Sequence, residues 1–425
     1  MKGDGAPPTA PAGLLFALVT VTFGMHLVAR GVAETFSLFL LPVQESLGSS
    51  RSAMTGVYSL YMLALGVGGL LAGRVFDRFG PRTLYAMGLL GMGGGYWLAG
   101  QVTGIWQYYL TVGLLGGLGG AALGMVPAAA LLSRWFTRRL GLVIGLAYAS
   151  MGVGVLVLLP LTQLMLEHVG WRTAYSILGG SILVLAVPVL LAPLSTLAGR
   201  SRKKNAPRPT GGTPGAGWTL AGAMREPAFW GLFMVYFFTS YAAYSILPQA
   251  VAYLVEMEFD PLFAASAVGF TGFLSVFGMA GVGWLSDRIG QLPTVTLSYL
   301  STLTGIAALI LLAYVPGAVL VYVFVLFFGL CQGARGPVIA TMAARLFAGG
   351  RMGSIYGAIS LGLGLGAAVG SWASGLFYDI TGGYMLSFTL AGVASVIGLA
   401  QFYVVPTLRY SDRPRPETVR ADRRR

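Results

Sequence analysis

The sequence predicts an all-α integral membrane protein with twelve transmembrane helices arranged as two six-helix bundles. Of its 425 residues, 56% are hydrophobic and only 10% are charged, whereas soluble domains carry roughly 25% charged residues. Apolar runs long enough to cross a bilayer, about 20 residues of helix, recur from end to end. Short sequence patterns of the first half also return in the second half, where Asp287 repeats Asp77 at an offset close to half of the chain.

The apolar runs place the helices and divide the chain. We expect a cytoplasmic N-terminus over 1–13, a first six-helix bundle over 14–194, a basic linker over 195–226, a second bundle over 227–406 and a basic tail over 407–425. The predicted helices are 14–41, 53–74, 84–101, 106–133, 141–166, 172–193, 227–254, 262–285, 293–313, 317–343, 353–377 and 385–406. The 63 glycines fit this class, because small residues let helices approach closely in lipid.

Composition excludes several other classes. A single cysteine, Cys331, rules out an intramolecular disulfide framework and a cysteine-rich metal site. The chain has two histidines, His26 and His168, and no pattern of paired buried carboxylates or of a nucleophile beside a base. We therefore expect no enzyme activity, no bound metal and no cofactor.

Positive charge predicts the orientation. The side that holds both predicted termini carries 23 of the 27 Lys and Arg residues, and the opposite loops carry only Arg51 and Arg172. Because positive loops stay in the cytoplasm, both termini are expected there. The net charge of +13 is thus a topology signal, with some attraction to anionic lipid, and does not indicate nucleic-acid binding.

The two remaining cations, Arg30 and Arg335, fall inside predicted helices. A charge at that depth costs about 2.5–3.5 kcal/mol on insertion scales unless it meets water or a partner. His26, Arg30 and Glu34 are four residues apart and share one helix face. Arg30 is therefore a candidate for binding an anion, and Glu34 and His26 are candidates for carrying a proton. The alternative is that Arg30 and Glu34 only neutralise each other as an i, i+4 pair.

Arg335 is the second candidate for binding an anion, with Gln332 one turn earlier. Alternatively, Arg335 binds backbone carbonyls that Pro337 leaves free, or reaches toward the membrane interface. Hydroxyl groups that could donate to a carboxylate follow on other helices, although packing is an alternative role for each of them. These residues are Ser240, Tyr244, Tyr148 and Tyr356.

The loop between the second and third predicted helices reads "GRVFDRFGPRT", and a weaker copy, "GVGWLSDRIG", follows the eighth helix. This pattern resembles the signature loop of the major facilitator superfamily. The resemblance implies a gating role for charged and glycine residues in both copies, without substrate contact. They are Gly73, Asp77, Arg78, Gly80, Arg82, Asp287 and Arg288.

Further segments resemble the monocarboxylate and oxalate/formate branch of that superfamily. They are "FSLFLLPVQESLGSSR", "RWFTRRLGLVIGLAYASMGVG", "GWRTAY" and "GLCQGARGPVI". The branch commonly carries an arginine in helix eight and often a lysine in helix eleven, and this chain has neither. Gln249 stands where a histidine is often found in helix seven, and Gly113 where many members carry an arginine in helix four.

The resemblance implies a secondary active transporter of small organic anions, mono- or dicarboxylates, that works by alternating access. Coupling to protons or anion exchange would drive it, and a drug exporter of the same superfamily is the alternative. The expected partners are the anion, protons and membrane lipid. We expect a monomer in the inner (plasma) membrane.

Overall fold

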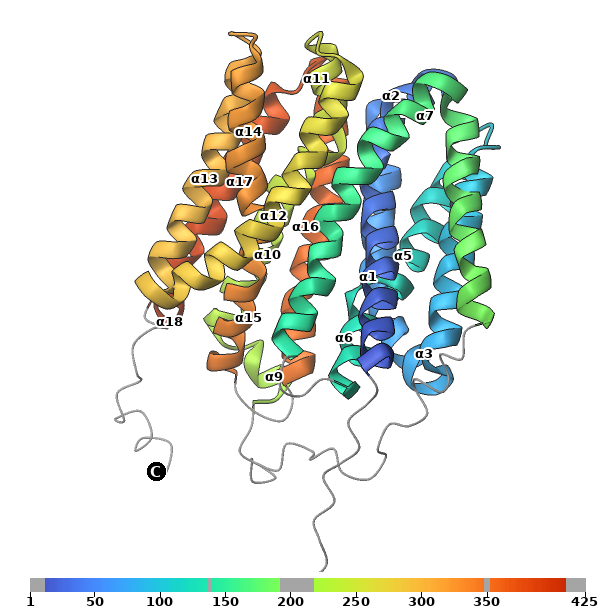
Figure 1. Cartoon of the computed structure of the whole chain (residues 1–425). Helices are drawn as coiled ribbons and strands as arrows, with labels where there is room; N and C mark the ends of the chain where they lie inside the picture. The colour runs from blue at the N-terminus through green and yellow to red at the C-terminus, as the bar shows by residue number, and fades with distance from the viewer. Residues whose placement is uncertain (1–11, 136–139, 192–217, 348–351, 410–425) are drawn as a thin grey trace, which may run out of the picture.

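The computed structural model describes residues 12–135, 140–191, 218–347 and 352–409, and within them the chain is helical throughout, with short turns and no strand (Figure 1). The first half contains α1 (Ala12–Glu34), α2 (Phe36–Leu47), α3 (Arg51–Ala99), α4 (Ile105–Tyr108), the π-helix η1 (Tyr109–Gly116), α5 (Gly117–Leu123), α6 (Met125–Trp135) and α7 (Leu140–Leu191). The second half contains α9 (Leu220–Ala223), α10 (Pro227–Tyr244), α11 (Leu247–Glu256), α12 (Pro261–Ile289), α13 (Gln291–Leu312), α14 (Ala318–Cys331), α15 (Arg335–Leu346), α16 (Met352–Thr381), α17 (Met385–Val404) and α18 (Pro406–Arg409).

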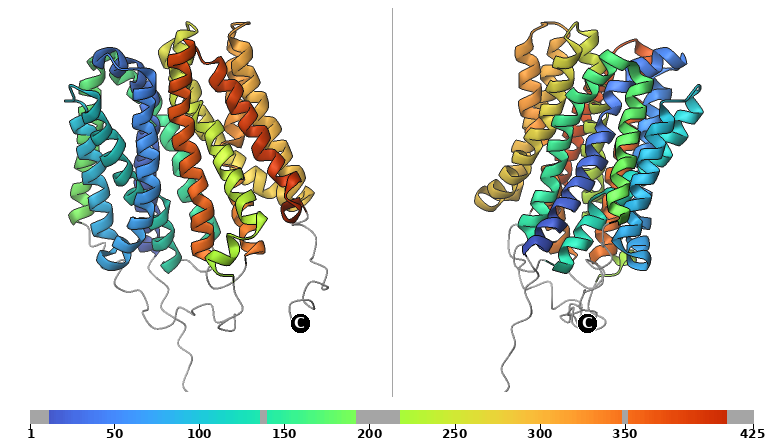
Figure 2. Two further views of the ribbon diagram at one scale, coloured as in Figure 1. Left: turned by 180° about the vertical axis from the view of Figure 1, so that it is seen from behind. Right: turned by 45° about the vertical axis from the view of Figure 1, so that its right-hand side comes forward.

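The helices stand side by side as two groups, with α1–α7 in one and α10–α17 in the other (Figure 2). The groups meet where α16 packs on α3, where α12 packs on α7 and where α11 packs on α2. We call the end of the molecule that holds Arg51 the Arg51 end, and the end where α3 reverses at Gly80 the Gly80 end. The bounds predicted for the linker and both termini lie largely outside the described residues and stay predictions.

The predicted helices are found in the described part, although two elements each contain a pair of them. Non-helical backbone at Gly80 divides α3, and the same feature at Gly170 divides α7. Ten described stretches are long and apolar enough to span a bilayer, and the one over Val143–Leu190 covers both arms of α7. The described fold is therefore an all-α membrane fold, as the sequence predicts.

Backbone geometry shows the internal repeat directly. Six of the seven positive φ angles in the described part occur in pairs at corresponding positions of the two halves, each at a turn between helices. Gly80 (φ 80°) corresponds to Gly290 (φ 91°), and Gly170 (72°) corresponds to Gly382 (69°). Gly48 (60°) corresponds to Glu258 (64°), which is the one described residue other than glycine with a positive φ. A side chain at that angle is sterically strained, so the repeated turn is kept even without glycine.

Four of the predicted continuous helices are broken, which the sequence analysis did not anticipate. The first is interrupted at Thr35 and the seventh at Ser245 and Ile246, which are corresponding positions of the repeat. The fourth contains the π-helix and then extended backbone at Gly124, and the tenth is interrupted from Gln332 to Ala334. Irregular backbone at membrane depth is tolerated only where protein or a cavity surrounds it, and these breaks fall at matching places in both halves.

The break in the tenth helix falls earlier than Pro337 suggested. Gln332 takes an extended conformation and Gly333 has a φ of 76°, and α15 then begins at Arg335. Pro337 therefore lies in the first turn of α15, where its missing N–H has no helical partner to lose.

Glycines allow the helices to touch backbone to backbone. A Cβ added to Gly152 of α7 would collide with the carbonyl oxygen of Gly272 in α12, at the crossing between the two halves. Within the first half, a Cβ at Gly179 would collide with the backbone N of Trp97, whereas one at the adjacent Gly180 would meet nothing within 4 Å. The high glycine content thus serves helix packing, as expected.

This contrast predicts the effect of one methyl group at two neighbouring positions. Gly179→Ala should destabilise the protein by about 1–3 kcal/mol, because the added atom forces the second arms of α3 and α7 apart. Thermal unfolding in detergent micelles measures the change, and Gly180→Ala is the control with no expected loss. Equal unfolding temperatures for both variants would contradict this packing.

Candidate functional site

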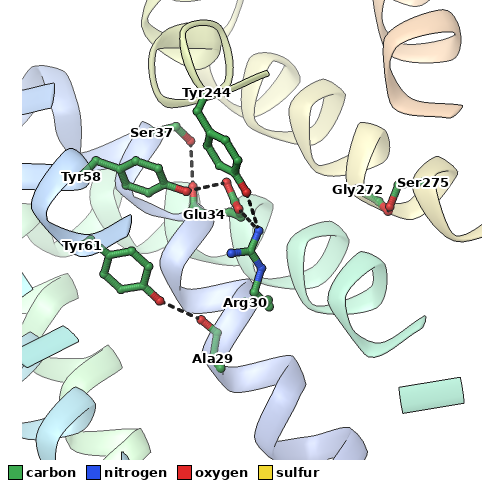
Figure 3. Close-up of polar contacts among 9 residues, drawn as sticks. All are labelled: Ala29, Arg30, Glu34, Ser37, Tyr58, Tyr61, Tyr244, Gly272 and Ser275. Carbon is green, nitrogen blue, oxygen red and sulfur yellow. Dashed lines mark hydrogen bonds and ion pairs between the residues drawn. The ribbon is translucent and has the colours of Figure 1, made fainter. Parts of the chain in front are cut away.

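Arg30 and Glu34 lie at the meeting of the two halves (Figure 3). Arg30 Nη2 donates to Glu34 Oε1 at 2.9 Å and to the hydroxyl of Tyr244, from α10, at 2.9 Å. The side chains of Arg30 and Glu34 are only 13% and 10% exposed. The i, i+4 ion pair that the sequence allows is therefore formed, and Tyr244 connects it to the second half.

Two tyrosines of α3 complete this cluster and were missed by sequence reasoning. The Tyr58 hydroxyl donates to Glu34 Oε2 at 3.3 Å, and Tyr61 reaches the carbonyl oxygen of Ala29 at 3.5 Å (Figure 3). Both rings are buried and stack with centroids 5.7 Å apart. Their three-residue spacing placed them on one helix face, but nothing local indicated that this face meets Glu34.

His26 is held by a different helix. Its Nδ1 lies 3.1 Å from the carbonyl oxygen of Ala147 and 3.0 Å from the Oγ of Ser150, both in α7. Tyr148, also in α7, packs edge-on against the imidazole ring and is itself 40% exposed. His26 and Tyr148 are thus brought together, and the hydrogen bonds of His26 are made to α7 and not to the Arg30–Glu34 pair.

Arg335 is buried in the second half, 4% exposed, between α15 and α13. Its Nε donates to Ser298 Oγ at 2.7 Å, and its Nη2 donates to the Ser298 carbonyl oxygen at 2.8 Å and to the Thr302 hydroxyl. The guanidinium carbon lies 3.9 Å from the centroid of the Tyr299 ring. In the described part of the chain no carboxylate lies within ion-pair distance of Arg335. Its charge is solvated by neutral groups alone.

A cavity of about 120 Å³ lies beside Arg335, against the breaks in the seventh and tenth helices. Four of the predicted site residues line it, namely Arg335, Gln332, Ser240 and Tyr244. Its other walls are Met151, Tyr236, Thr239, Ala243, Leu247, Gly333, Gly336, Ile339 and Leu363. Arg30 is not a wall residue, but it donates to the hydroxyl of Tyr244, which is one.

Gln332 and Tyr356 differ in what they offer the cavity. The buried Oε1 of Gln332 has no hydrogen-bond partner among the described groups, so its amide is available for another group. Tyr356 is not a wall residue, and its hydroxyl shares a 2.7 Å hydrogen bond with that of Tyr236, which is one. Tyr356 therefore contacts the site through Tyr236.

The predicted gating residues lie at the Gly80 end, away from the cavity. Gly80 forms the turn itself, and an added Cβ at Gly73 would meet nothing within 4 Å. Arg82 donates to the carbonyl oxygen of Leu190, which ties the second arm of α3 to the end of α7. Arg78 and Arg288 lie over the rings of Phe79 and Trp284, and Asp287 is exposed. The side chain of Asp77 lies outside the described part, and the gating role of all seven residues stays a prediction.

The arrangement is that of a membrane carrier: two repeated helix groups, breaks at membrane depth, and a buried cation beside a small cavity. The Major Facilitator Superfamily model matches residues 14–360, and the chain therefore belongs to this superfamily. It is a multi-pass membrane protein of a transporter family.

Individual relatives agree with this assignment. Monocarboxylate transporter 13 of Bos taurus is 27% identical over 402 residues, which cover 94% of this chain and 91% of the relative. An uncharacterised MFS-type transporter of Bacillus subtilis, YcxA, is 24% identical over 405 residues, covering 93% and 96%. Among solved structures, a bacterial homologue of the human lysosomal transporter Spinster, in an inward-facing and occupied conformation, has a TM-score of 0.73 at 14% identity. The match covers 97% of this chain and all of that one, and shows that the fold is shared.

The Arg30–Glu34 geometry predicts a non-additive effect on stability. Arg30→Gln should cost up to about 3–5 kcal/mol, because it leaves the Glu34 carboxylate unneutralised in a buried place. Adding Glu34→Gln to that variant should restore part of the loss, since the remaining groups are neutral. Thermal unfolding of the two single variants and the double variant measures the coupling. If the two single losses simply add, the pair is not coupled in the folded protein.

Proposed function

We propose that the protein is a secondary active transporter of small monocarboxylates, with Arg335 as the cation that holds the carboxylate. The observation that carries this proposal is that Arg335 is buried at a cavity wall without an acidic partner among the described residues. A buried cation without a counter-ion is costly unless an anion joins it. Without substrate, Ser298 and Thr302 accept hydrogen bonds from Arg335. A carboxylate could replace these neutral acceptors at little loss of hydrogen-bond energy.

The charges at membrane depth favour a monoanion over a dianion. Arg30 and Glu34 neutralise each other, so the described buried groups around the cavity carry one net positive charge from Arg335. One carboxylate balances that charge, whereas a second would enter a buried place unpaired. Tyr244, Ser240 and Gln332 provide polar contacts, and Leu247, Ile339 and Leu363 provide an apolar wall for a short carbon chain.

The cavity is also small. Its 120 Å³ compares with the roughly 300–1,000 Å³ of pockets that take drug-sized ligands. This supports a small anion and disfavours the drug exporter as the alternative. The monocarboxylate transporters among the relatives support the same substrate class by their names, although the arginine proposed here lies in helix ten and not in helix eight.

We place the coupling proton on Glu34, with substrate exchange as the alternative mode. Protonation of Glu34 would release Arg30 from its ion pair, and Arg30 also binds Tyr244, a wall residue of the cavity. Protonation of Glu34 would thus affect the substrate site through Arg30 and Tyr244, the latter a side chain of the second half. Because His26 is bound by α7, it is the second candidate.

Charge and relatives support a proposed location. We place the protein in the plasma membrane as a monomer, with both termini in the cytoplasm, in line with the excess of Lys and Arg on that side and with the bacterial relatives. The Arg51 end then faces outward and the Gly80 end faces the cytoplasm.

Uptake measurements with variants of Arg335 test the substrate site. Arg335→Gln should lower the affinity for a short monocarboxylate by at least about tenfold, since loss of one partner of a buried charge pair costs a few kcal/mol. Arg335→Lys should recover only part of the lost affinity, because an ammonium cannot reproduce the planar bidentate contact of a guanidinium. Binding in detergent, followed by thermal shift, separates affinity from turnover. Wild-type affinity in both variants would refute the assignment.

The proton pathway has its own test in proteoliposomes. Glu34→Gln should abolish accumulation driven by a pH gradient while exchange of internal for external substrate continues, because the neutral side chain cannot release a proton. The same preparation assayed for exchange is the control for folding. Accumulation against a gradient by this variant would remove Glu34 as the carrier and leave His26, or a proton carried by the substrate.

A further inference from the structure

A cluster of side chains joins the two halves at the Arg51 end, outside the proposed substrate site. Arg51, the first residue of α3, is 2% exposed and reaches into the second half. Its Nη2 donates to Glu256 Oε1 at 2.6 Å and to the Tyr384 hydroxyl at 3.3 Å. Its guanidinium carbon lies 4.2 Å from the centroid of the Tyr378 ring. Of the two salt bridges in the described part, this is the one that connects the halves.

Glu256, at the end of α11, is held by more than Arg51. The hydroxyl of Tyr384 donates to Glu256 Oε1 at 2.7 Å, and that of Tyr378 donates to Oε2 at 3.2 Å. Burial raises the pKa of Tyr384 well above its ordinary value, so its hydroxyl keeps the proton that it donates. The carboxylate is therefore aimed at Arg51 by two tyrosines of its own half.

Asp379, near the end of α16, makes a contact of a different kind. Its Oδ1 accepts from the backbone N–H of Arg51 and its Oδ2 from that of Ser52, both at 2.8 Å. These are among the first N–H groups of α3, which have no partner within their own helix. The helix also has its own cap, since Ser50 Oγ accepts from the N–H of Ala53. Asp379 thus adds a second cap from the opposite half, where the helix dipole favours a negative charge.

The internal repeat shows that this contact is not a general consequence of the fold. The crossing of α12 with α7 repeats that of α3 with α16, and Glu167 occupies a place in the first half close to that of Asp379 in the second. Glu167, however, accepts from Gln163 of its own helix. The start of α12 is capped by its own Asp260, which accepts from Phe263 N–H. Only one of the two equivalent crossings carries a cap from the other half in the described residues.

We propose that Arg51, Glu256, Tyr378, Asp379 and Tyr384 form a latch that holds the Arg51 end closed, and that its strength sets how often this end opens. The proposal builds on the transporter family and is independent of the carboxylate assigned to Arg335. All the contacts of Glu256 and Asp379 with α3 must break when the halves separate there. Nε and Nη1 of Arg51 have no hydrogen-bond partner in the latch, so closing leaves two buried donors unsatisfied. This cost keeps the latch reversible.

The two parts of the latch predict different genetic behaviour. The pair of Arg51 and Glu256 joins two side chains. The double variant Arg51→Glu/Glu256→Arg should therefore restore part of the closed population that each single variant loses. The cap by Asp379 binds backbone, so no change of side chain at position 51 replaces it. Asp379→Asn keeps one accepting oxygen and loses only the charge, so it should fall between the native protein and Asp379→Ala, which removes both acceptors.

Distances between spin labels on the two halves test the latch directly. Labels at Gln101 and Tyr314, both exposed and in turns at the Arg51 end, are attached in a Cys331→Ser background, in nanodiscs and without substrate. We expect the ratio of long to short distances to rise at least about threefold in Asp379→Asn and in Glu256→Gln. Glu258→Gln is the matched control and should leave the ratio unchanged, because Glu258 is an exposed acid two residues from Glu256 whose side chain makes no hydrogen bond or ion pair among the described residues.

Two results would overturn the latch. One is an unchanged distance distribution in both Asp379→Asn and Glu256→Gln, with folding checked by gel filtration. The other is a ratio of long to short distances in the double variant Arg51→Glu/Glu256→Arg that is as high as in the more open of the two single variants. Because the experiment is done without substrate, neither result depends on whether Arg335 binds a carboxylate.

Discussion

The cost of charge inside a membrane is the constraint on which the rest of this structure depends. Each buried ion here answers that cost differently. Arg30, at membrane depth, is neutralised within its own helix by Glu34, and Arg51, buried at the Arg51 end, is paired with Glu256 of the other half. Arg335 has only hydroxyls, a carbonyl oxygen and an aromatic face in the described part. An ion pair that is complete needs no ligand, whereas a cation without a counter-ion favours one, and for this reason we propose Arg335, and not Arg30, as the anion site.

The repeat supplies the cavity beside that cation. Breaks in the first and seventh helices, and in the fourth and tenth, fall at corresponding places, so both halves interrupt the same helices at membrane depth. The cavity lies against the breaks of the second half, with Tyr244 just before one and Gln332 at the other. The halves differ in what they place there. The first provides a neutral Arg30–Glu34 pair, and the second provides Arg335. Tyr244, a cavity wall of the second half, accepts a hydrogen bond from Arg30 of the first.

Sequence reasoning predicted the features that depend on local pattern. Hydropathy located the helices, residue counting found the two cations at membrane depth, and four-residue spacing placed Arg30 and Glu34 on one helix face, with their ion pair as an alternative to anion binding by Arg30. It did not predict the breaks, because Gly333 is one glycine among many in helices where glycine serves packing. Nor could it tell which arginine is neutralised, since Arg335 is bound by Ser298 and Thr302, 37 and 33 residues away. Tyr58 and the Asp379 cap lie 24 and 328 residues from their partners, distances at which no sequence period operates.

A structure of the protein with a transported short-chain carboxylate bound tests the central claim most directly. The account predicts that the carboxylate lies in the cavity at hydrogen-bond distance, about 2.7–3.2 Å, from the guanidinium of Arg335. The substrate should not lie between Arg30 and Glu34, whether Glu34 is ionised or protonated. A carboxylate bound to Arg30, with Arg335 still donating to Ser298 and Thr302, would contradict it.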